Sequence, residues 1–347
     1  METEIKAYSY EALAELLKQL GQPSFRADQL ANWLYAHSVT SYDEMENLPK
    51  TLRMTLCENH PLYTPTVINR QISKDKTRKY VLEFHDKTRV ETVAMPSEKD
   101  SFGHQRMSVC VSTQVGCPMA CSFCATGKEG FLRNLLPGEI IDQIKIVEED
   151  TGIVATNIVT MGQGEPFLNY ENVLAALRFA NHPKLLGIGA RHITLSTCGI
   201  IKGINHLSQE PEQFTLAVSL HCAIQKTRNK LMPKVANENL STLKECLIAY
   251  VKRTNRRISF EYILLEGITD DEASLAALIS YCKDLLCHVN LLPVNKVEGS
   301  LFSPSSTSTT KKWLSELEKA HIPVTLRKSR GSDISGACGQ LKNSLNE

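Results

Sequence analysis

Short β-branched stretches alternate with amphipathic helical patterns through the last two thirds of the chain. The strand-like stretches are residues 107–113, 156–161, 191–197, 214–220, 258–264 and 288–292. The helical patterns are residues 139–149, 170–181, 240–253, 271–286 and 307–321. Because such strands pair in parallel through right-handed crossovers, this order predicts an α/β fold that forms a partial or full barrel. Functional side chains are then expected at the carboxyl ends of the strands.

The first hundred residues have a different pattern. Residues 10–20 and 26–37 carry Leu, Ala, Trp and Tyr at helical spacing, so they predict a helical domain over residues 1–62. Residues 80–84 and 89–93 are strand-like and flank a polar turn, which predicts a β-hairpin, followed by a linker, within residues 63–102. The core barrel is expected over residues 103–333 and a C-terminal tail over residues 334–347.

Composition excludes several classes of protein. The chain has 347 residues, 42% of them hydrophobic and 22% charged, as in soluble globular proteins. No apolar run is long enough to cross a bilayer and no signal peptide is visible, so a cytoplasmic location without membrane contact is expected. The formal charge of +1 means that any contact with nucleic acid must come from local basic clusters. Three such clusters are Lys74–Lys79, Lys252–Arg257 and Arg327–Arg330.

Three of the eleven cysteines form a Cys-x3-Cys-x2-Cys triplet directly after the first core strand: Cys117, Cys121 and Cys124. Three closely spaced thiolates suit an iron–sulfur cluster, and a [4Fe-4S] cluster with three protein ligands keeps one iron open. A structural zinc site would need a fourth Cys or His at matching spacing, and neither follows Cys124. The alternative of three buried cysteines without a ligand role fits this density poorly. The triplet therefore predicts a [4Fe-4S] cluster with an open iron.

The triplet, with Phe123 before its last cysteine and a β/α barrel behind it, resembles the radical S-adenosylmethionine superfamily. That resemblance implies a partial (β/α)6 barrel and S-adenosylmethionine bound to the open iron. Reductive cleavage of the bound cofactor then gives a 5′-deoxyadenosyl radical beside the substrate.

Further motifs along nearly the whole chain resemble one branch of this superfamily, the adenine-C2 methyltransferases of 23S rRNA and tRNA called RlmN. They are FRADQL at residues 25–30, RVETV at 89–93, MGQGEP at 161–166, SLH at 219–221 and RGSDISGACGQL at 330–341. The related Cfr enzymes, which methylate adenine C8, share nearly all of these motifs, and the FRADQ stretch and the RKSRGSD stretch at residues 327–333 lean toward C2.

What this resemblance implies is a methyl group carried on a cysteine. Cys338 takes a methyl group from one S-adenosylmethionine, and the radical made from a second one removes a hydrogen atom from that methyl group. The resulting methylene radical adds to the adenine ring. Glu91 then removes the ring proton and Cys110 attacks the thioether sulfur, which leaves a Cys110–Cys338 disulfide to be reduced.

The resemblance also implies cofactor contacts and partners. The expected cofactor-binding residues are Gly164, Glu165, Ser196, Ser219, Leu220, His221 and Asn295. The expected partners are 23S rRNA and tRNA, bound mainly through the helical domain and the basic hairpin, together with an electron donor such as flavodoxin or ferredoxin. The protein is expected to be a monomer.

The residues alone leave alternatives open. Cys338 fits a free cysteine in a flexible tail, Cys110 a buried small hydrophobic residue, and Glu91 a carboxylate on the outer face of a strand. A Cfr-like C8 methyltransferase, or a non-catalytic iron–sulfur protein that binds RNA or carries electrons, also fits the triplet.

Four positions depart from the family pattern: Gln163, Cys198, Cys222 and Val235. We expect them to change details of the cofactor site and not the class of reaction. The remaining cysteines considered, Cys198, Cys222, Cys246, Cys282 and Cys287, are interpreted as core residues.

Overall fold

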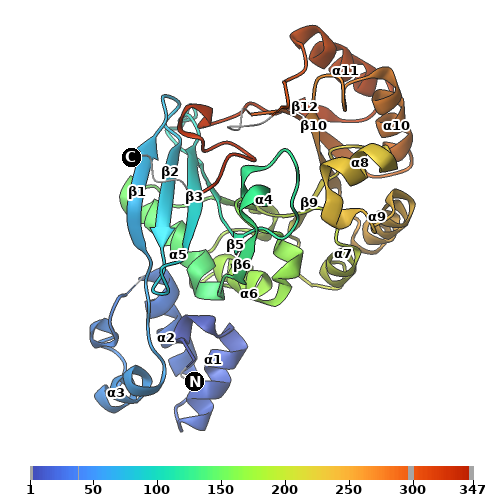
Figure 1. Cartoon of the computed structure of the whole chain (residues 1–347). Helices are drawn as coiled ribbons and strands as arrows, with labels where there is room; N and C mark the ends of the chain where they lie inside the picture. Colours follow the sequence, from blue (N-terminus) through green and yellow to red (C-terminus); the bar gives the residue numbers. More distant parts are fainter. Residues whose placement is uncertain (1–2, 38, 296–300, 344–347) are drawn as a thin grey trace.

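One continuous ten-stranded sheet runs through the molecule in the order β1-β2-β3-β4-β7-β8-β9-β10-β11-β12. The computed structural model describes residues 3–37, 39–295 and 301–343, so the outermost ends of the predicted terminal domains, residues 1–2 and 344–347, lie outside the described part. The sheet is curved, and helices cover its outer side (Figure 1).

The parallel part of the sheet is the predicted barrel. Its strands are β4 (Met107–Cys110), β7 (Asn157–Thr160), β8 (Ile193–Thr197), β9 (Thr215–Ser219), β10 (Ile258–Leu264), β11 (Cys287–Pro293) and β12 (Val324–Leu326). Each pairs in parallel with the next. Because the strand order is linear and β4 and β12 are not neighbours, the barrel is partial. The six predicted strands are confirmed, whereas β12, with three residues, was too short to show a pattern.

An antiparallel extension continues this sheet beyond β4. It consists of β1 (Thr66–Ile72), β2 (Arg78–Glu83) and β3 (Arg89–Pro96), and β3 pairs directly with β4. The predicted hairpin, β2–β3, is therefore confirmed but is part of the barrel sheet. Sequence patterning missed β1, an edge strand with Val67 and Ile72 exposed. A two-stranded ribbon, β5 (Gln114–Gly116) and β6 (Phe131–Asn134), was also missed.

Seven helices belong to the barrel: α5 (Pro137–Thr151), α6 (Tyr170–Asn181), α7 (Ile201–Leu207), α8 (Gln225–Leu231), α9 (Leu240–Thr254), α10 (Glu272–Cys282) and α11 (Thr307–Lys319). The predicted helices are confirmed, and the two that were missed, α7 and α8, have seven residues each. Helix α5 illustrates how the sequence determines where a helix begins and ends. It begins at Pro137, the Glu139 carboxylate accepts a hydrogen bond from the Leu136 N–H at 2.8 Å, and it ends at the left-handed Gly152.

The N-terminal helices α1 (Tyr10–Gln19), α2 (Phe25–Ala31) and α3 (Lys50–Asn59) form a lobe below the barrel in Figure 1. The second predicted helix changes after α2 into a π-helical turn at Asn32–Ala36. The lobe shares its core with the barrel, because buried Tyr35 stacks on Phe179 of α6 with ring centroids 4.0 Å apart. The buried Lys6 ammonium also bonds both carboxylate oxygens of Asp142 on α5, at 2.8 and 3.0 Å.

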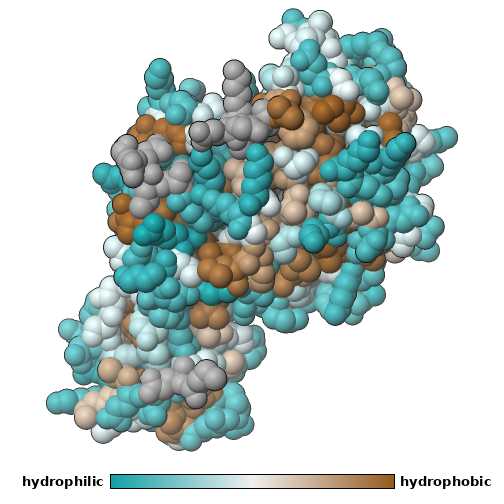
Figure 2. All heavy atoms as spheres, viewed as in Figure 1, coloured by the Kyte–Doolittle hydropathy of each residue, from teal (hydrophilic) through white to brown (hydrophobic). Residues whose placement is uncertain are grey.

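The visible surface of the lobe is mainly hydrophilic, with small apolar groups, while a larger apolar group lies over the β5–β6 region (Figure 2). Strand β6 exposes Phe131 and Leu132. Within the described residues, no helix combines the length and the hydrophobicity needed to cross a bilayer.

The Lys6–Asp142 pair gives a test of how the lobe is attached. Lys6→Met should lower the free energy of unfolding at neutral pH by about 3 kcal/mol, because it leaves a buried carboxylate without its counter-charge. Burial raises the pKa of Asp142 to about 6 even beside Lys6. Lys6 lowers this pKa, so the pKa lies higher in the variant, and the loss of stability should shrink as the pH falls toward 6, because the Asp142 carboxyl group of the folded variant becomes neutral over that range.

Urea denaturation of Lys6→Met at several pH values measures this effect. Lys18→Met is the matched control, because Lys18 pairs with Glu15 at the surface and its side chain is 78% exposed. A Lys6→Met deficit no larger than that of the control would contradict the assignment.

Candidate functional site

A cavity of about 230 Å³ opens at the carboxyl ends of the parallel strands. This is the end of the barrel at which the strand pattern predicted functional side chains. Many of the predicted site residues line it: Cys110, Cys117, Cys121, Cys124, Gly164, Glu165, Ser196, Ser219, His221, Asn295 and Cys338. Glu91 and Leu220 do not line it.

The three cysteines of the triplet lie on a loop between β5 and helix α4 (Ala125–Glu129). The loop starts at Gly116, which has a φ of 71° and whose Cα faces the Gly130 carbonyl so closely that a Cβ would lie 2.1 Å from that oxygen. The Cys117 N–H donates to the same carbonyl at 2.6 Å. Burial raises the pKa of Cys117 to about 12 and raises that of Cys124, so these thiols are neutral until a metal displaces their protons.

The surroundings of the triplet fit a [4Fe-4S] cluster. In the described part of the chain, no three His, Cys, Asp or Glu side chains converge as the ligands of a single metal ion would. Arg228 lies beside the loop with no exposed surface, and its Nη1 has no hydrogen-bond partner among the described residues. Three thiolates that share a polynuclear cluster would bring the negative charge that this buried cation lacks.

Cys198 is also part of this region, and its interpretation as a core residue was wrong. It lines the cavity just after β8 and packs against the apolar cluster that contains Cys121. The other four cysteines interpreted as core residues are buried: Cys222, Cys246, Cys282 and Cys287.

The loop after β7 carries the MGQGEP motif. Gly164 has a φ of 106°, and a Cβ there would lie 2.7 Å from Cβ of Gln114, so only glycine fits. The buried Glu165 carboxylate accepts hydrogen bonds from the N–H groups of Phe167 at 3.0 Å and Cys198 at 2.6 Å. Burial raises the pKa of Glu165, while these backbone bonds favour its charged form. Glu165 thus joins the ends of β7 and β8 and presents a carboxylate to the cavity.

Gln163, the departure within this motif, points away from the cavity. Its side-chain Oε1 accepts a hydrogen bond from the backbone N–H of Glu91 at 3.1 Å. The backbone N–H of Gln163 donates to the Ser112 hydroxyl at 2.9 Å. The expectation that Gln163 alters the cofactor site is therefore not supported by its position, because the side chain instead holds β3 at Glu91.

His221 closes another side of the cavity. Its ring meets that of Phe123 edge-on at 4.8 Å, and its φ is 56°. Burial lowers the pKa of His221 to about 3, so the imidazole is neutral. Leu220, in contrast, is buried in the hydrophobic core, and only its carbonyl reaches a functional neighbour, the Arg228 Nε at 3.2 Å.

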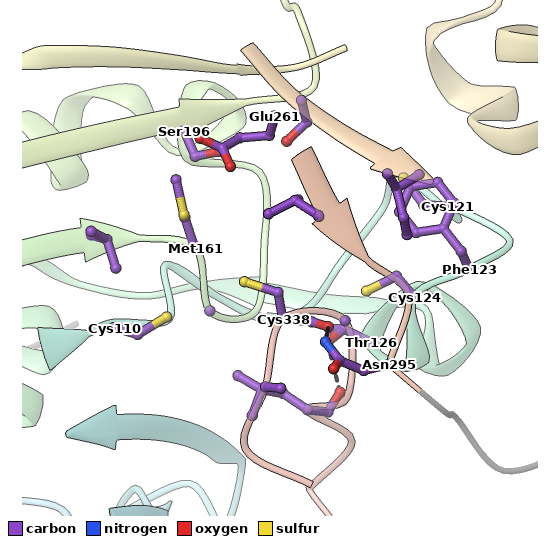
Figure 3. A pocket seen from close by; sticks show the side chains of 18 of the residues that line it. Cys110, Cys121, Phe123, Cys124, Thr126, Met161, Ser196, Glu261, Asn295 and Cys338 are labelled. Carbon is purple, nitrogen blue, oxygen red and sulfur yellow. Dashed lines mark hydrogen bonds between the residues drawn. The ribbon is translucent and has the colours of Figure 1, made fainter. Parts of the chain in front are cut away.

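The C-terminal tail folds back into the cavity. The Gly339 carbonyl accepts a bond from the Ala125 N–H at 2.7 Å, and the Leu341 carbonyl accepts one from the Thr126 hydroxyl at 2.7 Å. Asn295 Nδ2 donates to the Cys338 carbonyl at 3.1 Å. The tail is thus fixed to the start of α4, directly behind Cys124. Cys338 projects between Cys110 and Cys124 in Figure 3.

Cys338 and Cys110 share a cation. Burial raises the pKa of Cys110 to about 12. Cys338 is exposed as a residue, but the walls of the cavity around its thiol raise its pKa above the usual value. The Arg327 guanidinium acts on both thiols in the opposite direction and lowers their pKa values. Arg327 is held by the buried Glu261 carboxylate at 3.2 Å, which also accepts a bond from Asn290 at 2.7 Å. Arg327 was expected only as part of a local basic cluster, and Glu261 was not predicted, although it is the single charged residue of the mainly apolar strand β10.

Glu91 lies behind the tail and not in the cavity. Its carboxylate has no exposed surface, pairs with the buried Lys79 ammonium at 2.9 Å and accepts a bond from the Lys342 N–H at 2.8 Å. Val93, two residues further along β3 on the same face, does line the cavity. Glu91 is therefore next to the cavity but covered by the end of the tail. Lys79, which was expected in a basic cluster available to nucleic acid, is instead buried.

Comparison with known proteins agrees with this site. Residues 111–279 match the family model of the radical SAM superfamily, and residues 3–61 match the N-terminal domain of ribosomal RNA large subunit methyltransferases. The crystal structure of a radical SAM methyltransferase from Sphaerobacter thermophilus is 38% identical and superposes with a TM-score of 0.89, covering 99% of this chain and 100% of that one.

Two curated relatives are similar over nearly their whole length. The "probable dual-specificity RNA methyltransferase RlmN" of Clostridioides difficile is 41% identical over 97% of both chains. The protein of the same name from Desulforamulus reducens is 43% identical over 95% of this chain and 93% of its own. With the cysteine triplet, the partial barrel and the tail cysteine in one cavity, these matches establish that the chain belongs to the RlmN family of radical SAM methyltransferases.

Proposed function

We propose that this protein methylates C2 of an adenine in 23S rRNA and in tRNA, with the methyl group carried on Cys338. The observation that carries the proposal is the meeting of Cys338, Cys110 and the cluster cysteines in one cavity. An electron carrier would need the triplet but not a second pair of thiols opposite it. The curated relatives are named as RNA methyltransferases of dual specificity, which supports both substrates.

The walls of the cavity suit the two cofactors. Cys117, Cys121 and Cys124 would hold three irons of the cluster. Glu165 offers a buried carboxylate to the ammonium group of S-adenosylmethionine, and Gly164, Ser196, Ser219, His221 and Asn295 complete the walls around it. When bound, the cluster and S-adenosylmethionine supply a transferable methyl group and, after one-electron reduction, a radical that removes a hydrogen atom.

Cys338 first acts as a nucleophile. Its thiol loses a proton, and its sulfur forms a bond to the methyl carbon while the carbon–sulfonium bond breaks. Because desolvation disfavours the thiolate, the Arg327 guanidinium provides the compensating charge within the cavity. Arg327 is in turn kept in place by Glu261.

Cys110 and Glu91 complete the reaction. Once the carried carbon is bonded to the ring, the radical adduct gives up one electron, which the oxidised cluster would accept, and Glu91 takes the ring proton. The Cys110 thiolate then attacks Sγ of Cys338, the new S–S bond replaces the S–C bond, and the released carbon takes up a proton to become the methyl group. Since the Lys342 N–H covers Glu91, the end of the tail must open for this step.

The same proposal implies an electron donor and RNA as partners. A one-electron donor such as flavodoxin or ferredoxin would reduce the cluster, and the enzyme would act as a cytoplasmic monomer on unfolded RNA. Of the basic residues assigned to RNA contact on the hairpin, Lys74 and Lys76 are exposed, whereas Arg78 pairs with Asp150 at 2.6 Å. Since Lys74 and Lys76 lie on the turn between β1 and β2, we assign RNA contact to this turn and the N-terminal lobe.

The modified base tests the proposal directly. Cluster-loaded protein, a reductant and S-adenosylmethionine are incubated with 23S rRNA fragments or tRNA, and the RNA is digested to nucleosides. Mass spectrometry against standards should identify 2-methyladenosine in both substrates. Finding 8-methyladenosine would replace the proposal by C8 methylation, and finding S-adenosylmethionine cleavage without methylated RNA would reject it.

The role of Cys110 predicts a trapped intermediate. Cys110→Ala should lose turnover and accumulate protein covalently joined to RNA through Cys338, because no thiol is left to break the S–C bond. Denaturing gel electrophoresis of labelled RNA detects the adduct. Cys246→Ala is the matched control, since this cysteine is buried on α9 outside the cavity. Normal turnover by Cys110→Ala would remove Cys110 from the mechanism.

A further inference from the structure

Arg228 is a fully buried cation without a countercharge. It lies on α8 with no exposed surface. Its Nε donates to the Leu220 carbonyl at 3.2 Å and its Nη2 to the Cys198 carbonyl at 2.6 Å, while Nη1 has no partner. Among the described residues, no carboxylate forms an ion pair with it, although guanidinium groups are almost never buried without one.

The groups that face Arg228 are thiols and rings. They are the thiols of Cys198, Cys121 and Cys222 and the phenol of Tyr281, with the neutral His221 ring also in range. None of these groups is a carboxylate. Burial lowers the pKa of Arg228 accordingly. The buried Glu165 carboxylate bonds the N–H of Cys198, whose carbonyl Arg228 binds, but among the described residues no carboxylate pairs with the guanidinium itself.

Two contacts connect Arg228 to the cluster loop. Cys198, whose carbonyl it binds, packs against the apolar cluster that contains Cys121. One turn further along α8, the Leu231 carbonyl accepts a hydrogen bond from the Ser122 N–H at 2.9 Å. Met119 and Cys121 also pack in one apolar cluster with Leu231. Arg228 therefore lies directly behind the Cys121 side of the loop.

We propose that Arg228 is a positioning residue for the [4Fe-4S] cluster, a buried countercharge that raises the reduction potential of the cluster and helps to retain it. A cluster held by three thiolates has a net negative charge, which grows when the cluster accepts an electron. In a site without solvent a nearby fixed cation stabilises the reduced form more than the oxidised form. The inference rests on the cluster assignment but not on RNA methylation.

Two substitutions separate charge from hydrogen bonding. Arg228→Gln removes the positive charge but keeps an N–H donor for one carbonyl. Arg228→Lys keeps the charge but lacks the planar guanidinium that donates to two carbonyls at once. Arg256→Gln is the matched control, because Arg256 also donates to two carbonyls, those of Glu212 and Phe214 at 2.9 and 3.0 Å, but at the opposite end of the barrel, beside the start of β9.

The experiment uses full-length protein reconstituted anaerobically, without S-adenosylmethionine or RNA. The midpoint potential of the cluster is measured by redox titration followed by electron paramagnetic resonance, and melting temperatures are measured with and without the cluster. In Arg228→Gln the midpoint should become more negative, and the melting temperature should fall further in the loaded than in the cluster-free protein. Arg228→Lys should stay near the parental midpoint, and Arg256→Gln should leave it unchanged.

An unchanged midpoint in Arg228→Gln, or an equal shift in the Gln and Lys variants, would overturn the proposal and leave Arg228 as a link between two carbonyls. Equal losses of melting temperature in the loaded and cluster-free Arg228→Gln protein would do the same. Iron and sulfide analysis of the parental protein separates these outcomes from a failure of the cluster assignment itself, because a parent without bound cluster rejects that assignment first.

Discussion

The attachment of the C-terminal tail to the cluster loop is the constraint on which the site depends. The bonds from Ala125 and Thr126 to the carbonyls of Gly339 and Leu341 fix the tail at the start of α4, immediately after the last cysteine of the triplet. One short helix thus sets the positions of both Cys124 and Cys338. Although Cys124 and Cys338 lie far apart in the sequence, the bonds of the first two residues of α4 bring them to the same place.

The open side of the barrel makes this attachment possible. Since β12 does not pair with β4, the chain leaves β12 and passes the barrel mouth toward the hairpin, as Figure 1 shows. There the Asp333 carboxylate accepts bonds from the Ser73 hydroxyl and the Lys74 N–H, and the Gly331 N–H donates to Asp75. The antiparallel extension therefore anchors the tail at one end while β3 brings Glu91 under the other. A closed barrel would leave the tail no such route.

Much of this arrangement could be predicted from the sequence, and the exceptions have physical reasons. Periodicity revealed the six longer parallel strands and most helices, and the spacing of Cys117, Cys121 and Cys124 indicated a cluster without any structure. β12 and α8 were too short to show a period, so Arg228 could not be placed. The burial of Lys79 and the position of Arg327 in the cavity were hidden because each is one of several basic residues in its segment, and only packing decides which of them turns inward. Cys198 was misassigned because a cysteine at a strand end looks like a core residue until its neighbour Cys121 is known.

The central claim is that Cys338, and no other residue, carries the methyl group. Cluster-loaded protein, a reductant and S-adenosylmethionine with a deuterated methyl group can be incubated without RNA, and the protein can then be digested and its cysteine peptides analysed by mass spectrometry. The account predicts the deuterated methyl group on Cys338 and none on Cys110 or Cys198. Label on either of those cysteines, or methylated RNA from a protein that never carries the label, would contradict it.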